Sequence, residues 1–175
     1  DSDPGNVEQQ NKYWGFDIKG KTMGIIGLGR IGSTVASLAI GLGMKVIATN
    51  RSSKNMNGVE MVSLGQLLKR SDVVSINVTS GKDTENIISE KELNLMNPTA
   101  ILINVDQGKM VDTKALYQAL KNHKIAGAGL DQVAGLSKGH PILKLDNVVF
   151  TPHAGSSTNE SFREVLPELV VSAIE

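Results

Sequence analysis

The sequence predicts an α/β fold in which helices cover a doubly wound parallel sheet of about six strands. Two observations lead to this expectation. Short apolar runs alternate along the chain with segments of helical character, and a glycine-rich turn joins the first run to the first helix. The apolar runs lack the strict alternation of half-exposed strands, as expected for a parallel sheet buried on both faces. Ligands bind such sheets beyond the carboxyl ends of the strands, so the loops there are the candidate site.

Length and composition agree with a single domain of this kind. The chain has 175 residues and a formal net charge of zero, which favours neither nucleic acid nor an anionic membrane as a partner. It contains no cysteine, which excludes disulfides and fits a reducing compartment. No apolar run reaches the roughly 18 residues of a membrane span, and no signal peptide opens the chain. We therefore expect a cytoplasmic protein, and we predict no metal site.

The strongest motif is the glycine-rich turn. A strand at Thr22–Ile26 runs into Gly27-Leu28-Gly29-Arg30-Ile31-Gly32, and a helix and a second strand at 44–49 follow. In G-x-G-x-x-G, the first glycine permits the turn, the second lets backbone approach a pyrophosphate, and the third lets the helix pack on the strand. The helix start, with Arg30 and Ile31, offers N–H donors to phosphate. This context predicts a Rossmann-type dinucleotide site; the alternative is a glycine-rich turn without a ligand.

The remaining elements follow in alternation. Val78, at the end of the third main strand, lies where a bound cofactor would pass and is a candidate contact. Ser63 is a possible helix cap, and Pro167 would kink or restart the last helix. Strands are expected at 72–78, 100–105, 125–130 and 148–150, and helices at 7–16, 62–69, 89–96, 112–123 and 156–175.

The residues after the second strand indicate which dinucleotide binds. An acidic side chain commonly ends this strand and accepts hydrogen bonds from the adenosine ribose, whereas this chain has Asn50, 18 residues after Gly32. Asn50 carries no charge that would repel a 2′-phosphate, and Arg51, Ser52 and Lys54 offer cationic and hydroxyl donors. These residues favour NADP(H) over NAD(H). The alternative is a solvated turn in which Asn50 binds the ribose of NAD through neutral hydrogen bonds.

Several runs resemble one family in the same order along the chain. They are Gly20–Gly32, Ser71–Ser75, Asn104 with Gly108 and Val111-Asp112, Gly129-Leu130-Asp131 and Asp146–His153. Over residues 18 to 165 the chain resembles the nucleotide-binding domain of the D-isomer-specific 2-hydroxyacid dehydrogenases. The resemblance implies hydride transfer between a nicotinamide cofactor and a 2-oxo or 2-hydroxy acid, as in glyoxylate and hydroxypyruvate reductases and phosphoglycerate dehydrogenase.

The resemblance also implies a division of the chain. Residues 1–17 would be a lead-in and an interdomain helix, 18–155 the NAD(P)-binding domain, and 156–175 a second interdomain helix. On this division, the family's substrate domain would lie outside this chain. In this family the nucleotide-binding domain usually also makes the dimer, so a homodimer is expected.

Three catalytic groups are implied by the resemblance: an arginine that holds the substrate carboxylate, a histidine that protonates the carbonyl oxygen, and a glutamate that keeps the histidine charged. His153, which follows Pro152, matches the histidine; its alternative is a structural histidine at a strand end. His123 and His140 have no such placement, and we expect both at the surface. Asp131 matches the position that contacts the nicotinamide amide.

The arginine and the glutamate are replaced. Gln107 stands at the arginine position and cannot form the charged fork that grips a carboxylate. Lys109 could partly substitute for the arginine, although a solvated loop lysine is the simpler interpretation. Leu136 stands at the glutamate position, five residues after Asp131, and residues 132–145 include no acidic side chain.

Two functions therefore fit the sequence. The first is the cofactor domain of a 2-hydroxyacid dehydrogenase-like oxidoreductase with reduced or altered activity, which His153 favours. The second is a catalytically inactive dinucleotide-binding sensor or dimerisation scaffold, which Gln107 and Leu136 favour.

Overall fold

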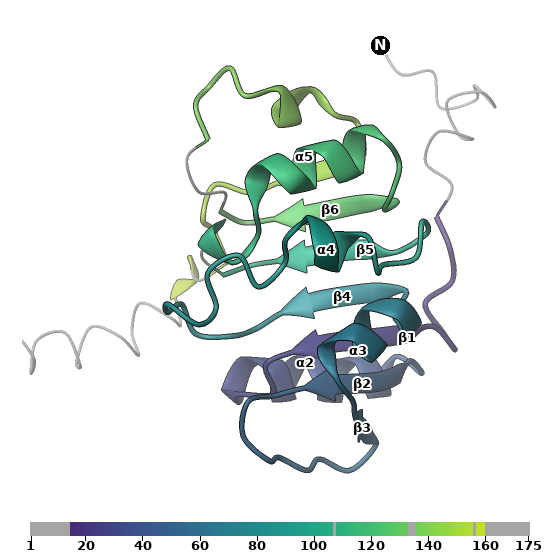
Figure 1. The fold of residues 1–175 in the computed structure, drawn as a ribbon. Helices are drawn as coiled ribbons and strands as arrows, with labels where there is room; N and C mark the ends of the chain where they lie inside the picture. The colour runs from purple at the N-terminus through teal and green to yellow at the C-terminus, as the bar shows by residue number, and fades with distance from the viewer. Residues whose placement is uncertain (1–14, 107, 133–135, 156, 160–175) are drawn as a thin grey trace, which may run out of the picture.

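A computed structural model describes residues 15–106, 108–132, 136–155 and 157–159. They form one parallel sheet of seven strands in the order β3-β2-β1-β4-β5-β6-β7. The carboxyl ends of the strands lie along one edge, on the left in Figure 1, which we call the carboxyl edge. The strands are β1 (Thr22–Ile26), β2 (Lys45–Thr49), β3 (Val59–Met61), β4 (Val73–Ile76), β5 (Ile101–Asn104), β6 (Gly127–Leu130) and β7 (Val148–Phe150).

Helices cover the two faces of the sheet unequally. In Figure 1, α3, α4 and α5 lie in front of the sheet, whereas α2 lies behind β1 and β2. The strand order reverses between β1 and β4, so the chain winds outward in both directions from this point and creates the switch point at which such folds bind ligands. The helical elements are α2 (Arg30–Gly41), α3 (Leu64–Arg70), α4 (Glu90–Leu93), η1 (Gly108–Met110), α5 (Thr113–Lys121) and η2 (Pro141–Lys144).

The sheet separates two apolar cores. Because side chains alternate along a strand, Ile25 of β1 joins the cluster beneath α2, and Ile26 joins the larger cluster beneath α3, α4 and α5. In β2, Ile47 joins the larger cluster, while its neighbours Val46 and Ala48 face α2. Both faces of the central strands are therefore buried, which explains their continuous apolar sequence. The predicted doubly wound parallel fold is confirmed.

The predicted elements differ from the structure in three respects. The structure adds β3, a three-residue strand whose sequence contains Glu60 and gives no periodic signal, and which pairs with β2 at the margin of the sheet. The helix expected at 89–96 is shorter, because α4 covers only Glu90–Leu93. The structure also adds two short 3-10 helices, η1 and η2, where no element was expected.

The helix start at Ser63 is confirmed. Its hydroxyl accepts a hydrogen bond from the backbone N–H of Gln66 at 3.4 Å, and the Gln66 side chain accepts one from the backbone N–H of Ser63 at 3.1 Å. This reciprocal pair satisfies two N–H groups that the first turn of a helix leaves free. It fixes the residue at which α3 begins.

The two helices expected at the ends of the chain, at 7–16 and 156–175, fall almost entirely outside the described residues. Gly15 and Phe16 are described and are not helical. In the described part of the chain, no helix has both the length and the apolar character that crossing a membrane requires.

Candidate functional site at the carboxyl edge

Each glycine of the G-x-G-x-x-G turn has a different structural role. Gly27 has a φ of +93°, and a Cβ there would lie 2.6 Å from the Asn77 carbonyl oxygen. A Cβ on Gly32 would lie only 2.0 Å from the Gly27 carbonyl oxygen, so this position brings α2 against β1. Gly29, in contrast, faces open space. The first and third glycines therefore build the turn, and the second leaves room for a ligand.

The N-terminus of α2 is open toward that space. Gly29 is the N-cap residue and supplies no side-chain hydrogen bond, and the first turn contains no acidic residue. The first N–H groups of a helix, here beginning at Arg30 and Ile31, have no intrahelical carbonyl partner and carry the positive end of the helix dipole. They fit an anionic group such as a pyrophosphate.

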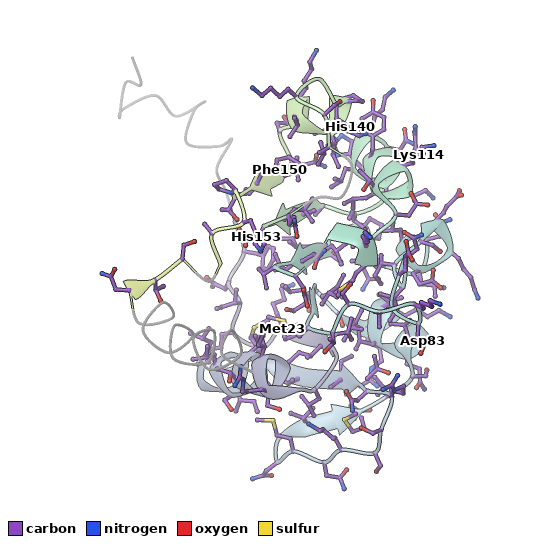
Figure 2. All side chains as sticks on the ribbon, turned by 90° about the vertical axis from the view of Figure 1, so that its left-hand side faces the viewer. Met23, Asp83, Lys114, His140, Phe150 and His153 are labelled. Atoms are coloured by element: carbon purple, nitrogen blue, oxygen red, sulfur yellow. The ribbon has the colours of Figure 1, made fainter. Side chains whose placement is uncertain are left out.

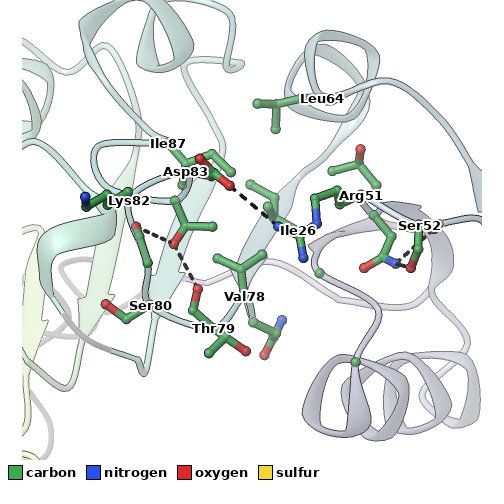
Figure 3. Close-up of a pocket in the computed structure, with 17 residues that line it drawn as sticks. Ile26, Arg51, Ser52, Leu64, Val78, Thr79, Ser80, Lys82, Asp83 and Ile87 are labelled. Carbon is green, nitrogen blue, oxygen red and sulfur yellow. Dashed lines mark hydrogen bonds and ion pairs between the residues drawn. The ribbon is translucent and has the colours of Figure 1, made fainter.

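A cavity of about 630 Å³ lies beside this turn, at the switch point of the sheet. Figure 3 shows its walls, with Ile26 and Val78 at its floor, the Arg51 and Ser52 segment on one side and the Lys82 and Asp83 loop on the other. Its size is that of a small-molecule site. The cavity brings together six of the predicted cofactor residues: Gly27, Gly29, Asn50, Arg51, Ser52 and Val78.

Asn50 ties the wall of the cavity to the glycine turn. Its Oδ1 accepts a hydrogen bond from the backbone N–H of Leu28 at 3.1 Å, and its Nδ2 donates to both the carbonyl oxygen and the hydroxyl of Ser52 at 3.0 Å. Lys54 Nζ donates to the Leu28 carbonyl oxygen at 3.0 Å. Asn50 uses both ends of its amide here, which an aspartate could not do because it has no N–H donor.

Arg51 reaches across the mouth of the cavity. Its Nη1 lies 3.6 Å from Asp83 Oδ2, and the two side chains are 92% and 83% exposed (Figure 3). An ion pair this exposed contributes little stability, so a phosphate could displace Asp83 at small cost.

Sequence reasoning expected a ligand at the loops beyond the strand ends but named no residue of the loop after β4, where residues 79–84 line the cavity together with Asn77. Asn77 Nδ2 donates to the Ser75 carbonyl oxygen and hydroxyl, whereas its buried Oδ1 has no hydrogen-bond partner among the described residues. An unpaired buried oxygen is costly unless a ligand or water donates to it. The signal was available in the sequence, since Asn77 lies at the carboxyl end of an expected strand.

His153 lies farther along the same edge. Figure 2 looks onto this edge and shows His153 between Phe150 and Met23. Its side chain is exposed and its φ is +56°. Its backbone N–H donates to the Asp131 carbonyl oxygen at 2.8 Å. Asp131 itself is 3% exposed.

The Asp131 carboxylate is held by the loop that carries His153. It accepts hydrogen bonds from the Thr151 hydroxyl and from the backbone N–H groups of Ala154 and Gly155, the latter two at 2.9 Å. The Thr151 hydrogen bond, then the two backbone hydrogen bonds, and to a smaller extent the charge of His153, lower the pKa of Asp131 below its ordinary value. Asp131 is therefore anionic at neutral pH.

The structure describes one of the two positions at which the resemblance implies an arginine and a glutamate. Gln107 lies outside the described residues. Leu136 is partly buried and packs against the larger core, as an apolar side chain should. Lys109, in η1, is exposed.

The other two histidines, His123 and His140, differ in exposure. His123 is exposed, as expected. The surface placement expected for His140 is wrong, because it is partly buried, its Nδ1 accepts a hydrogen bond from the Ile142 backbone N–H at 3.3 Å, and its ring meets Tyr117 edge-on at 6.1 Å. It caps η2. Across the described ranges, no three His, Asp or Glu side chains are grouped to hold a metal ion.

Comparison with known proteins gives this site a family. The profile described as "D-isomer specific 2-hydroxyacid dehydrogenase, NAD binding domain" matches residues 2–155. Glyoxylate reductase from Thermococcus litoralis is 48% identical over 163 residues, which are 90% of this chain and 49% of that protein. The chain thus spans about half the length of such relatives.

Solved structures give the same result. An acyclic imino acid reductase in complex with NADPH and D-Arg is 42% identical with a TM-score of 0.86, covering 90% of this chain and 51% of the other. The NAD complex of a D-isomer specific 2-hydroxyacid dehydrogenase from Lactobacillus delbrueckii ssp. bulgaricus is 34% identical with a TM-score of 0.84, covering 92% and 54%. The chain described here belongs to the D-isomer specific 2-hydroxyacid dehydrogenase family, as its NAD-binding domain.

Proposed function

We propose that this chain binds NADP(H) for an oxidoreductase that transfers hydride between the nicotinamide and a small 2-oxo or 2-hydroxy acid. One observation carries the proposal: the uncapped start of α2 opens beside a cavity of about 630 Å³ at the switch point of the sheet. Glyoxylate is the first substrate to test, because related proteins carry the name glyoxylate reductase.

The preference for NADP(H) rests on the wall after β2. Residues 50–58 contain no acidic side chain, and Arg51 and Lys54 are cationic. A 2′-phosphate would meet Arg51 and the Ser52 hydroxyl, and charge-assisted hydrogen bonds are about twice as strong as neutral ones. Relatives of known structure include both an NADPH complex and an NAD complex. The proposed preference for NADP(H) therefore depends on the residues of this chain alone.

In the proposed reaction His153 is the general acid that protonates the substrate oxygen while hydride arrives at carbon. Asp131 lies at the nicotinamide end of the site. Gln107 would donate hydrogen bonds to the substrate carboxylate from an uncharged amide, without the charged fork of an arginine, which predicts weak substrate binding. Leu136 supplies no charge to His153.

A second function is supported by Leu136. Its packing against the core is that of an ordinary apolar residue and leaves no carboxylate at this position. The chain would then be a dinucleotide-binding sensor or dimerisation scaffold that binds the cofactor without turning over a substrate.

A homodimer is part of the proposal. Helix α2 has no charged residue after Arg30, and its surface exposes Ile31 and Leu38 at 60% and 63%, with Leu42 just beyond it at 58%. An uncharged, apolar helix surface is typical of a buried subunit contact. Light scattering of the purified chain tests this directly. A cytoplasmic location stays a prediction that rests on the cysteine-free sequence.

The deciding experiment is a fluorescence titration of the chain with NADPH and with NADH. We expect NADPH to bind about tenfold more tightly, a difference of about 1.4 kcal/mol. The variant Asn50→Asp should reverse the preference, because a carboxylate repels the 2′-phosphate, accepts hydrogen bonds from the ribose and cannot donate to Ser52. Tighter binding of NADH by the natural chain would overturn the proposed preference.

Asn122→Asp is the matched control. It makes the same chemical change at an exposed position after α5. It should alter neither affinity. In the longest natural polypeptide that contains this chain, saturable binding followed by reduction of glyoxylate supports the enzyme, whereas binding without any turnover supports the sensor.

A further inference from the structure

The loop after β7 is fastened to one buried side chain. The Asp131 carboxylate accepts hydrogen bonds from three donors of this loop: the Thr151 hydroxyl and the backbone N–H groups of Ala154 and Gly155. The two backbone donors lie 2.9 Å from the carboxylate oxygens. Asp131 is 3% exposed, although every residue from 151 to 155 is exposed. A buried anion thus supports an exposed loop.

The backbone at His153 needs this support. Its φ of +56° lies in the left-handed region, which is uncommon for a residue other than glycine. Such a conformation persists only where its surroundings hold it. The backbone N–H of His153 donates to the Asp131 carbonyl oxygen at 2.8 Å. Asp131 therefore binds His153 itself through its backbone, and the residues before and after it through its carboxylate.

We propose that Asp131 is the positioning residue for His153: it fixes the direction of the imidazole and places a buried negative charge beneath its loop. This inference rests on the proposed function, in which His153 is the general acid. Asp131 would also supply the negative charge that Leu136 cannot supply. Residues 132–145 contain no Asp or Glu that could hydrogen-bond to the loop instead.

The same carboxylate keeps room for the cofactor. A carboxylate oxygen can accept about two hydrogen bonds. Among the described residues, Oδ1 already accepts two, from Thr151 and Ala154, whereas Oδ2 accepts one, from Gly155. Oδ2 can therefore accept one further donor, such as a nicotinamide amide. Contact with the cofactor and support of the loop are compatible in one residue.

Gly155 allows the approach. A Cβ at this position would lie 2.9 Å from Asp131 Oδ2, closer than a real Cβ tolerates. The absence of a side chain is what lets the backbone N–H reach the carboxylate.

The test compares amide hydrogen exchange, measured by NMR, in the natural chain and in Asp131→Asn, Thr151→Val and Thr151→Ser. In Asp131→Asn, the side-chain NH2 group would face a backbone N–H donor and could not accept its hydrogen bond. Thr151→Val removes the hydroxyl that donates to Asp131, and Thr151→Ser keeps it. We expect exchange at Ala154 and Gly155 to accelerate about 100-fold in Asp131→Asn and about tenfold in Thr151→Val, with Ser restoring protection. Thr99→Val, at an exposed turn, is the control.

The location of the change separates positioning from general stability. Amides of β4 and β5 should keep their protection in Thr151→Val, and affinity for NADPH should stay within about twofold. In the longest natural polypeptide that contains this chain, kcat for glyoxylate should fall about tenfold in Thr151→Val with KM unchanged, and Ser should restore it.

Two results would overturn the inference: unchanged exchange at 154 and 155 in Asp131→Asn, or a loss of protection spread evenly over the sheet in Thr151→Val. Failure of the natural chain to bind NADPH would overturn the proposed function instead. The exchange data would still decide whether Asp131 fastens the loop, so the two failures are distinguishable.

Discussion

The two ends of the carboxyl edge differ in whether backbone or side chains form the site. At the ends of β1, β2 and β4, which we call the cofactor side, the site depends on backbone: a turn with positive φ, a tight helix contact and the open start of α2. At the ends of β5, β6 and β7, the histidine side, the site depends on the side chains of Asp131, Thr151 and His153. The cofactor side keeps the three glycines of the motif. On the histidine side, the resemblance implies an arginine and a glutamate at the positions of Gln107 and Leu136.

This difference has a physical cause. The glycines of the cofactor side also determine how α2 packs on β1, so a substitution there damages the fold together with the site. On the histidine side a side chain can change without such a cost. Leu136, at the position where the resemblance implies a glutamate, packs against the core. Cofactor binding and catalysis can therefore diverge separately along one sheet.

The largest effect should come from Gly32→Ala. Its Cβ would lie 2.0 Å from the Gly27 carbonyl oxygen, so α2 must move away from β1. We expect the free energy of unfolding to fall by about 3 kcal/mol, because overpacking against rigid backbone costs this much. Thermal unfolding followed by circular dichroism measures it, and NADPH binding should be lost.

Gly29→Ala is the matched variant, since Gly29 faces open space. Its free energy of unfolding should change by less than about 1 kcal/mol, the difference between Gly and Ala at an N-cap. Its affinity for NADPH should nevertheless fall, because the Cβ would occupy the path of the pyrophosphate. Equal loss of stability in both variants would mean that the two glycines do not have separate roles.

The histidine side should respond in the opposite direction. The double variant Gln107→Arg with Leu136→Glu restores the two missing charges, and we expect kcat/KM for glyoxylate or hydroxypyruvate to rise tenfold to a hundredfold. This corresponds to about 1.5–3 kcal/mol for a hydrogen bond to a charged group. A steady-state assay in the longest natural polypeptide that contains this chain measures it.

Each single variant is needed as well. Leu136→Glu alone should lower stability, because Leu136 packs against the core and a carboxylate there loses hydration. Gln107→Arg alone should lower KM more than it raises kcat. An unchanged rate in the double variant would favour the sensor.

Sequence reasoning succeeded where one local pattern determines the structure. The glycine turn, the Ser63 cap and the alternation of strands with helices each have a signature of a few residues, and each is found in the structure. It failed for β3, whose three residues become a strand only because β2 lies beside them. Tertiary pairing of this kind leaves no periodicity in a short segment.

The same limit applies to the site. His140 was expected at the surface because its contacts cannot be predicted from the sequence. They are a hydrogen bond from the backbone N–H of Ile142 and an edge-on ring contact with Tyr117. The bonds from Asp131 to residues 151, 154 and 155 join segments more than 19 residues apart. A resemblance assigned Asp131 to the cofactor, but only the folded chain reveals its hold on the histidine loop.

A smaller effect should separate stability from binding on the cofactor side. Ser63→Ala removes the cap of α3, and we expect a loss of about 1 kcal/mol in the free energy of unfolding. Urea denaturation measures it. Because Ser63 does not line the cavity, affinity for NADPH should not change. Ser63→Thr, which keeps the hydroxyl, should recover most of the loss; a weaker NADPH affinity would show that α3 transmits strain to the cavity.

The last prediction concerns pH on the histidine side. Near neutral pH we expect no change in the amide protection of the loop, whereas acid should open the loop. Three hydrogen bonds and the charge of His153 lower the pKa of Asp131 from its ordinary value of 3.8. A carboxyl group with a lowered folded pKa contributes stability that is complete above the unfolded pKa and is lost as the pH falls through the folded pKa. Amide protection at Ala154 and Gly155, corrected for intrinsic exchange, should therefore stay constant from about pH 8 to about pH 5 and be lost only below pH 3.8, as the pH falls through the lowered pKa of the folded state. Thr151→Val removes the largest cause of the lowered pKa, so its loop should open at a higher pH. Opening near pH 6 to 7, where an ordinary imidazole titrates, would mean that His153 rather than Asp131 controls the loop.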